Sequence, residues 1–232
     1  HAALEAKVKL IKKLNPKRIY TEDDYDGHEI NHHERDRIIA QGMLALMRAN
    51  SLEEGLHYLR ENLEAILEAA PTDSIVIRKR SNHPHWVERY LQGGWFMKES
   101  QNTSIGIELA SAMNQGMDPI DYFLKKHMRP EIYRRVVTLK PGEPIYEGER
   151  PVLVSMHGDK GTNGAKGSMN SFIEATPAAI YGHTHYEQIF NRITNMAAMA
   201  KYPQPYAKEG FSKALIGNSG VGPNGEIQTY RY

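Results

Sequence analysis

Acidic, amide and imidazole side chains recur in four short polar loops, and each loop directly follows a short apolar segment. The loops are centred on Asp23, Asn82-His83, His157 and His183-Thr184-His185. Carboxylate, amide and imidazole groups are ligands for divalent ions such as Mn, Fe, Zn and Ni. The chain has no cysteine, which excludes a thiolate site. The four loops together predict a metal centre with oxygen and nitrogen ligands.

Each loop also has a simpler structural interpretation. An acidic pair such as Asp23 and Asp26 commonly forms a turn or caps a helix, and Asn82-His83-Pro84 is typical of turns. A lone histidine after a strand, such as His157, is often a hydrogen-bonded structural residue. The segment Gly182-His183-Thr184-His185 is the more specific signal, because two histidines two residues apart after a strand seldom gather for packing alone.

Short strands and helices alternate along the chain, and the strands place the polar loops. Helices are predicted at 2–14, 33–49 and 51–70, and strands at 18–21, 74–79, 151–155, 178–181, 214–216 and 227–232. Ser51 and Glu54 form a capping box at the start of one helix. Residues 85–150 are predicted as a mostly helical insertion. The pattern indicates an α/β fold, in which ligands converge at strand ends.

The size and composition are those of one globular domain spanning 1–232. The 232 residues are 40% hydrophobic and 25% charged, as is usual for globular proteins. No apolar run approaches the length of a membrane span, so no membrane partner is expected. The lack of cysteine is compatible with a reducing cytoplasm. A net charge of +1 means that nucleic-acid binding requires a local basic face. A homo-oligomer is left open.

The order of the polar loops resembles the calcineurin-like metallophosphoesterases. After a first Asp-x-His, the blocks of that family read Gly-Asp-x-x-Asp, Gly-Asn-His-Asp/Glu, a lone His and Gly-His-x-His. They are matched here by residues 22–26, 81–84, 157 and 182–185. The glycine-rich stretch 157–168 is most similar to phage-encoded members, some of which are DNases. The resemblance covers nearly the whole chain and implies a two-sheet β sandwich flanked by helices, in α-β-β-α layers.

The match departs from the family pattern in three places. No Asp-x-His precedes Asp23, so the resemblance implies that the first strand and its block lie upstream of residue 1. Glu22 stands where the family has glycine. Ser81 and Pro84 replace the outer residues of the third block, while the chemically important Asn82-His83 is kept.

The resemblance implies roles for the matched residues. Two divalent ions are expected, with Mn in the first place and Fe, Zn, Ni or Mg as alternatives. Their ligands would be Asp23, Asn82, His157, His183 and His185. His83 would be catalytic, stabilising charge on the phosphate or protonating the leaving oxygen. Residues that would orient ligands or bind substrate are Asp26, His28, Lys160 and Lys166.

The function implied is a divalent-metal-dependent phosphoesterase, foremost a nuclease that hydrolyses DNA phosphodiester bonds in the cytoplasm, of the host if phage-encoded. Positive charge at Lys160, Lys166 and the run Arg78-Lys79-Arg80 would suit such a polyanionic substrate. A solvated charged face is an equally open interpretation of these cations. A phosphomonoesterase or nucleotide phosphodiesterase is the first alternative function. A non-catalytic scaffold of the same fold, suggested by the absent first block, is the second.

Overall fold

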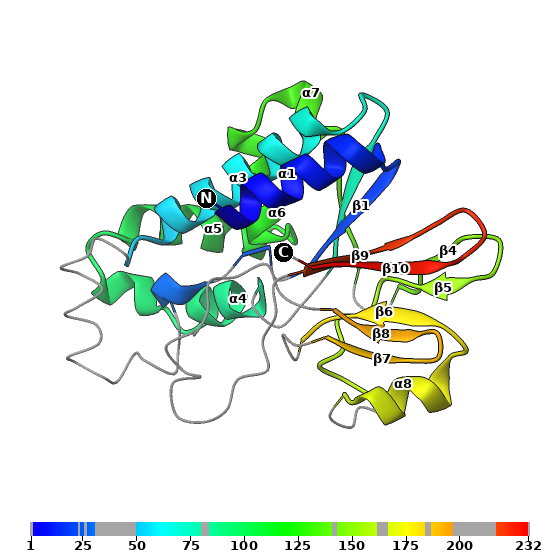
Figure 1. The fold of residues 1–232 in the computed structure, drawn as a ribbon. Helices are drawn as coiled ribbons and strands as arrows, with labels where there is room; N and C mark the ends of the chain where they lie inside the picture. Colours follow the sequence, from blue (N-terminus) through cyan, green and yellow to red (C-terminus); the bar gives the residue numbers. More distant parts are fainter. Residues whose placement is uncertain are drawn as a thin grey trace. The chain divides into compact units, whose positions relative to one another are not determined.

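The computed structural model shows a mixed α/β fold that divides into two compact units (Figure 1). It describes residues 2–22, 24–25, 27–30, 50–79, 84–140, 143–161, 167–183, 187–196 and 217–231. The central unit is the contiguous segment Lys17–Thr138, and the split unit combines His1–Pro16 with Leu139–Tyr232. The α/β class predicted from the sequence is confirmed at this level. That both units form the single domain 1–232 stays a prediction.

A three-stranded parallel sheet is the frame of the central unit. Its strands are β1 (Arg18–Thr21), β2 (Ile75–Arg78) and β3 (Val136–Thr138), in the order β1-β2-β3. Thr21 pairs with Arg78, and Arg78 pairs with Thr138. Because parallel strands end at the same edge of a sheet, the segments that follow β1 and β2 start side by side.

Helix α3 (Leu52–Ala69) lies between β1 and β2 in sequence and shows how local signals set the element bounds. The Ser51 hydroxyl accepts the Glu54 backbone N–H at 3.2 Å, as the predicted capping box requires. The helix ends before Pro71, as expected. Its buried stripe follows the helical period and consists of Leu52, Leu56, Leu59, Leu63, Ile66 and Leu67. Burial of each such side chain contributes about 1.5–3 kcal/mol.

The segment between β2 and β3 is mostly helical, as predicted. It contains α4 (Pro84–Gln92), the short 3-10 helix η2 (Trp95–Lys98), α5 (Thr103–Asn114), α6 (Pro119–His127) and α7 (Pro130–Tyr133). Another 3-10 helix, η1 (His28–Ile30), follows β1. The strands β3 and β4 (Tyr146–Glu147) also fall within the predicted helical insertion. The sequence did not signal them, because runs of two or three residues are too short to show a period.

A five-stranded mixed sheet is the frame of the split unit. Its order is β4-β5-β6-β8-β7, with β5 (Val152–Leu153), β6 (Ala179–Tyr181), β7 (Gln188–Phe190) and β8 (Ile193–Asn195). The three inner strands are parallel, and both edge strands run antiparallel to their neighbours. Helix α8 (Met169–Ala175) packs on this sheet through Phe172, whose ring stacks on Tyr181 with 4.0 Å between centroids (Figure 1).

The split unit is completed by α1 (Ala2–Leu14) and the hairpin of β9 (Gly217–Val221) and β10 (Ile227–Arg231). The helix predicted at 2–14 and the final strand are confirmed. The helix predicted at 33–49 and the strand predicted at 214–216 lie outside the described residues. Residues 217–220 pair with β10. Their glycines and polar residues show no apolar alternation, so the strand depends on backbone pairing alone. None of the helices in the described ranges combines the length and apolarity that a membrane crossing requires.

Candidate metal centre

The structure describes three side chains of the predicted site, those of His157, Lys160 and His183. For His28 it describes the backbone, in η1, but not the side chain. The other predicted site residues lie outside the described part of the chain: Asp23, Asp26, Asn82, His83, Lys166 and His185. The geometry of the centre is therefore given by the two histidines, and the remaining ligands stay predictions.

His157 and His183 lie side by side, although they are 26 residues apart in sequence. Nδ1 of His183 is 3.2 Å from Nε2 of His157, and the two rings meet edge to face with 5.0 Å between centroids. His157 is buried, with an exposed fraction of 3%, and His183 is partly buried. Each follows one of two adjacent parallel strands, β5 and β6, so the shared sheet edge brings them together.

The backbone around the two histidines is held in an unusual conformation. The Gly182 N–H donates to the His157 carbonyl oxygen at 2.9 Å, which joins the two loops at their start. His183 has a φ of 78°, in the left-handed region that costs a non-glycine residue about 1–2 kcal/mol. Such conformations are retained where surrounding structure enforces them, and they cluster at functional sites. The conformation of His183 therefore supports a functional rather than a packing role.

The spacing of the imidazole nitrogens fits both a hydrogen bond and a shared metal ion. Two nitrogens that each lie about 2.0–2.1 Å from one tetrahedral ion are about 3.3 Å apart, close to the 3.2 Å observed. Imidazole suits the borderline divalent ions that the sequence predicts. Within the described ranges, no group of three or more His, Asp or Glu side chains forms a complete ligand set. The histidine pair thus fits part of a metal site.

Asp159 and Gly167, in the glycine-rich stretch after His157, lie side by side. The Gly167 N–H donates to the Asp159 carbonyl oxygen at 3.0 Å, and a Cβ at Gly167 would lie 1.8 Å from the Gly158 carbonyl oxygen. Only glycine allows this approach. Lys160 is exposed and makes no ion pair with any residue whose position is described. Its ammonium group is thus exposed, three residues from His157 in sequence.

Two buried ion pairs fix the segment that follows β1 in the central unit. The Asp24 carboxylate accepts from Arg78 Nε at 2.7 Å and from Arg78 Nη2 at 3.1 Å. Lys79 Nζ lies 2.5 Å from Glu22 Oε2. The side chains of Arg78 and Lys79 are 4% and 1% exposed. Both neighbours of Asp23 in sequence are thereby attached to the end of β2, the strand that leads to Asn82.

These ion pairs correct the interpretation of Arg78-Lys79-Arg80 as charge that faces a substrate. The Arg78 and Lys79 side chains are buried and paired, and Arg80 lies outside the described residues. Burial by itself would lower the pKa of Arg78, but the Asp24 carboxylate holds that pKa above its ordinary value. The end of β2 is buried because β1 and β3 flank it, so its cations require carboxylate partners.

Sequence reasoning missed this pairing, although a signal for it exists. Two acids flank Asp23 directly after one strand, and two bases end the next strand. Parallel pairing of those strands sets the acids opposite the bases.

The chain has no match among known proteins. Comparison by family, by sequence and by structure found no family model, no curated protein and no solved structure that matches it.

Proposed function

We propose that this chain is a divalent-metal-dependent phosphoesterase, foremost a nuclease that hydrolyses DNA phosphodiester bonds with two ions, Mn in the first place. The observation that carries the proposal is the close contact of His157 and His183 at the ends of adjacent parallel strands. The order of the polar loops, which resembles the calcineurin-like metallophosphoesterases, supports it. Parallel strands before polar loops in both units are compatible with the two-sheet sandwich of that family.

The proposal assigns three roles to residues of the chain: metal ligand, proton donor and phosphate-binding cation. His157 and His183 would hold one ion. Asp23, Asn82 and His185 stay the ligands that the resemblance implies. The chemistry that such ions supply is activation of a bound water and neutralisation of charge on the phosphate oxygens. His83 would protonate the leaving oxygen or stabilise the charge that grows on the phosphate. Lys160 would attract the phosphate from the exposed side.

The position of the histidines explains why their metal affinity would be high. Burial of His157 limits competition from water, and the bond from Gly182 to the His157 carbonyl oxygen keeps both loops in register. The side chains are therefore preorganised, so little conformational entropy is lost when an ion binds.

Metal-dependent stabilisation tests the first half of the proposal. At a Mn concentration of about 100 times Kd, binding stabilises the native state by about 2.7 kcal/mol, which raises the Tm of a chain of this size by about 5–11 °C. His157→Ala and His183→Ala should abolish the Mn-induced shift in calorimetry. The matched control is His127→Gln, which removes a histidine of α6 in the central unit. A wild-type Tm that Mn, Zn, Ni and Fe all leave unchanged would show a hydrogen-bonded structural pair instead.

Substrate preference tests the second half. Plasmid DNA and p-nitrophenyl phosphate are offered to the wild type with Mn, each with and without EDTA. The proposal expects Mn-dependent cleavage of the plasmid and its loss in His157→Ala, with His127→Gln active. Turnover of p-nitrophenyl phosphate without plasmid cleavage would replace the nuclease by the phosphomonoesterase alternative. Metal binding without any turnover would favour the scaffold.

A further inference from the structure

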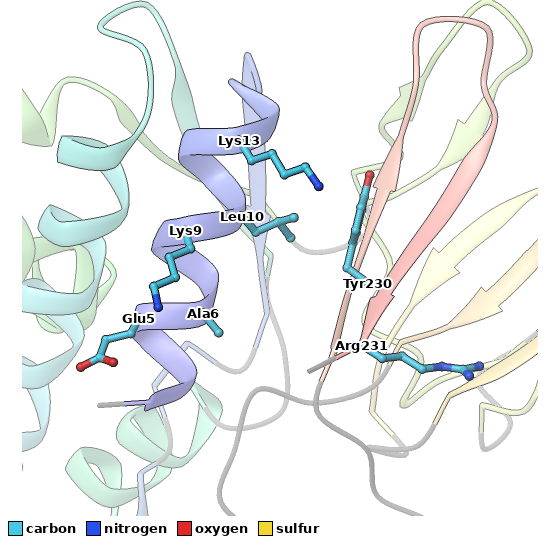
Figure 2. Close-up of a pocket in the computed structure, with 7 residues that line it drawn as sticks. All are labelled: Glu5, Ala6, Lys9, Leu10, Lys13, Tyr230 and Arg231. Carbon is cyan, nitrogen blue, oxygen red and sulfur yellow. The ribbon is translucent and has the colours of Figure 1, made fainter.

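A basic groove lies between α1 and β10 within the split unit. It has a volume of about 660 Å³ and is lined by Glu5, Ala6, Lys9, Leu10, Lys13, Tyr230 and Arg231. Figure 2 shows Lys13 and Leu10 extending from the helix toward the ring of Tyr230. In the same view Lys9 and Glu5 extend to the other side of the helix, so Lys13 is the cation that faces the ring.

Three exposed lysines of α1 supply positive charge at the groove. Lys9, Lys12 and Lys13 are exposed, and none of the three makes an ion pair within the described ranges. Their spacing of three and four residues brings them to neighbouring positions on the helix surface. Glu5 is the one acid among the residues that line the groove. Lys9 and Lys13 line the groove, with Lys12 beside them on the helix, and these cations outnumber Glu5.

The other cation of the groove is already neutralised. Arg231 Nε and Nη2 bond the two carboxylate oxygens of Glu187 at 2.7 and 2.8 Å, and the Arg231 guanidinium points away from the helix (Figure 2). The hydrogen bond from Arg231 lowers the pKa of Glu187, which keeps this pair charged. An anion in the groove would therefore be met by the lysines of α1 rather than by Arg231.

The ring of Tyr230 is oriented within the groove. Its hydroxyl donates to Gln228 Oε1 at 2.7 Å, and the side chain is only partly buried. A positive groove that holds an exposed aromatic face is the arrangement with which proteins bind single-stranded nucleic acid, because phosphates meet the cations and a base stacks on the ring. A base paired in a duplex cannot reach a ring in this way.

We propose that this groove binds single-stranded DNA, with Lys9, Lys12 and Lys13 on the phosphates and Tyr230 stacked on a base. The inference rests on the proposed nuclease function and deepens it, since it names the form of the substrate. Attachment to an anionic membrane is the less favoured occupant. The groove is concave, and Ile11 on the apolar face of α1 is 5% exposed, so that face is not available to enter a bilayer.

The test is binding of fluorescent oligothymidylate, measured by anisotropy in EDTA so that no hydrolysis occurs. The variant Lys9→Gln/Lys12→Gln/Lys13→Gln should bind about tenfold to a hundredfold more weakly at ~0.1 M salt, and its slope of log K against log salt should be shallower by about 2. The control variant changes the same charge at three scattered exposed lysines: Lys98→Gln/Lys125→Gln/Lys140→Gln. Its affinity should change by less than about threefold, with an unaltered slope.

Two single variants test the aromatic face and the acid. Tyr230→Ala should weaken binding about fivefold or more, while Tyr230→Phe keeps the stacking surface and should bind like the wild type. Glu5→Gln should tighten binding, because it removes the one negative charge of the groove. Equal affinities and slopes for the two triple-lysine variants would overturn the inference. The inference would also be overturned if Lys9→Gln/Lys12→Gln/Lys13→Gln lost binding to phosphatidylserine vesicles but bound oligothymidylate like the wild type.

These outcomes separate the groove from the metal centre. Binding in EDTA requires no metal, so normal oligonucleotide binding with no hydrolysis in Mn would contradict the proposed function alone. Mn-dependent hydrolysis with no effect of the α1 lysines on binding would contradict the groove alone.

Discussion

Replacement of Asp24 by alanine is expected to destabilise the central unit by about 3–5 kcal/mol, the range for removing one partner of a buried ion pair. The Asp24 and Arg78 side chains are 10% and 4% exposed, so the guanidinium would remain buried without a carboxylate. The Arg78 guanidinium cannot become neutral by losing its proton, because its pKa is high and is raised further in the folded chain. The hydrogen bond from the Thr21 hydroxyl to Asp24, 3.0 Å long, is lost as well. The expected fall in Tm is about 6–20 °C.

Urea unfolding followed by tryptophan fluorescence is the suitable assay. Both tryptophans, Trp86 and Trp95, lie in the central unit, so their fluorescence reports the unit that contains the ion pair. The control is Glu61→Ala, which removes an exposed pair with Arg60 and should cost less than about 1 kcal/mol.

A double variant distinguishes an unpaired charge from a general loss of packing. Asp24→Ala/Arg78→Met removes both charges and should recover a large part of the stability that Asp24→Ala loses, since the penalty arises from the uncompensated guanidinium. If Asp24→Ala costs no more than Glu61→Ala, the carboxylate does not neutralise Arg78 and the reasoning fails. If the double variant is no more stable than the single one, the loss has another origin.

The remaining predictions concern strain, close approach and pH. His183→Gly should be more stable than His183→Ala by about 0.5–1 kcal/mol in calorimetry, because glycine accepts the positive φ; the reverse order would argue against strain. Gly167→Ala should lower the free energy of unfolding by about 2 kcal/mol or more, because the new Cβ meets a backbone oxygen. Gly116→Ala, where the Cβ would have open space, should lower it by about 1 kcal/mol. Equal losses for the two variants would contradict the close approach at Gly167. Burial and the imidazole of His57 lower the pKa of His127 from 6.5, so the folded chain favours the neutral form of His127. The stability that this gives is fully present above pH 6.5 and is lost as the pH falls through the lowered pKa. His127→Gln should flatten the dependence of Tm on pH there, and an unchanged profile would exclude this origin.

Local signals in the sequence predicted much of the fold. The helix at 2–14, the capped start of α3 and the final strand depend on periodicity and capping, which act over a few residues. No such signal marks β9, where Gly217 to Val221 are extended because β10 pairs with them. A strand of that kind is specified by the backbone pairing of its hairpin, and backbone pairing leaves no pattern in the side chains.

The candidate site shows the same division. That His157 and His183 would meet was predicted from their positions after strands, because adjacent parallel strands end at one edge. The burial of Arg78 and Lys79 was not predicted, because it depends on which strands flank β2. Charges beside a predicted site were interpreted as substrate-facing, and only tertiary structure shows that two of them neutralise acids within the protein.

The division of the split unit between the two ends of the sequence has a consequence for the order of folding. Helix α1 precedes the central unit in the chain, but the strands of its unit follow only after residue 138. The central unit is contiguous and can fold while the rest is still being made, whereas closure across it is a long-range step and slow. During refolding, amides of β2 should therefore gain protection from hydrogen exchange before those of α1, which joins its unit only by closure across the central unit; simultaneous protection would contradict this order. The histidine pair lies wholly in the segment after residue 138, so it can form only after the central unit has been made.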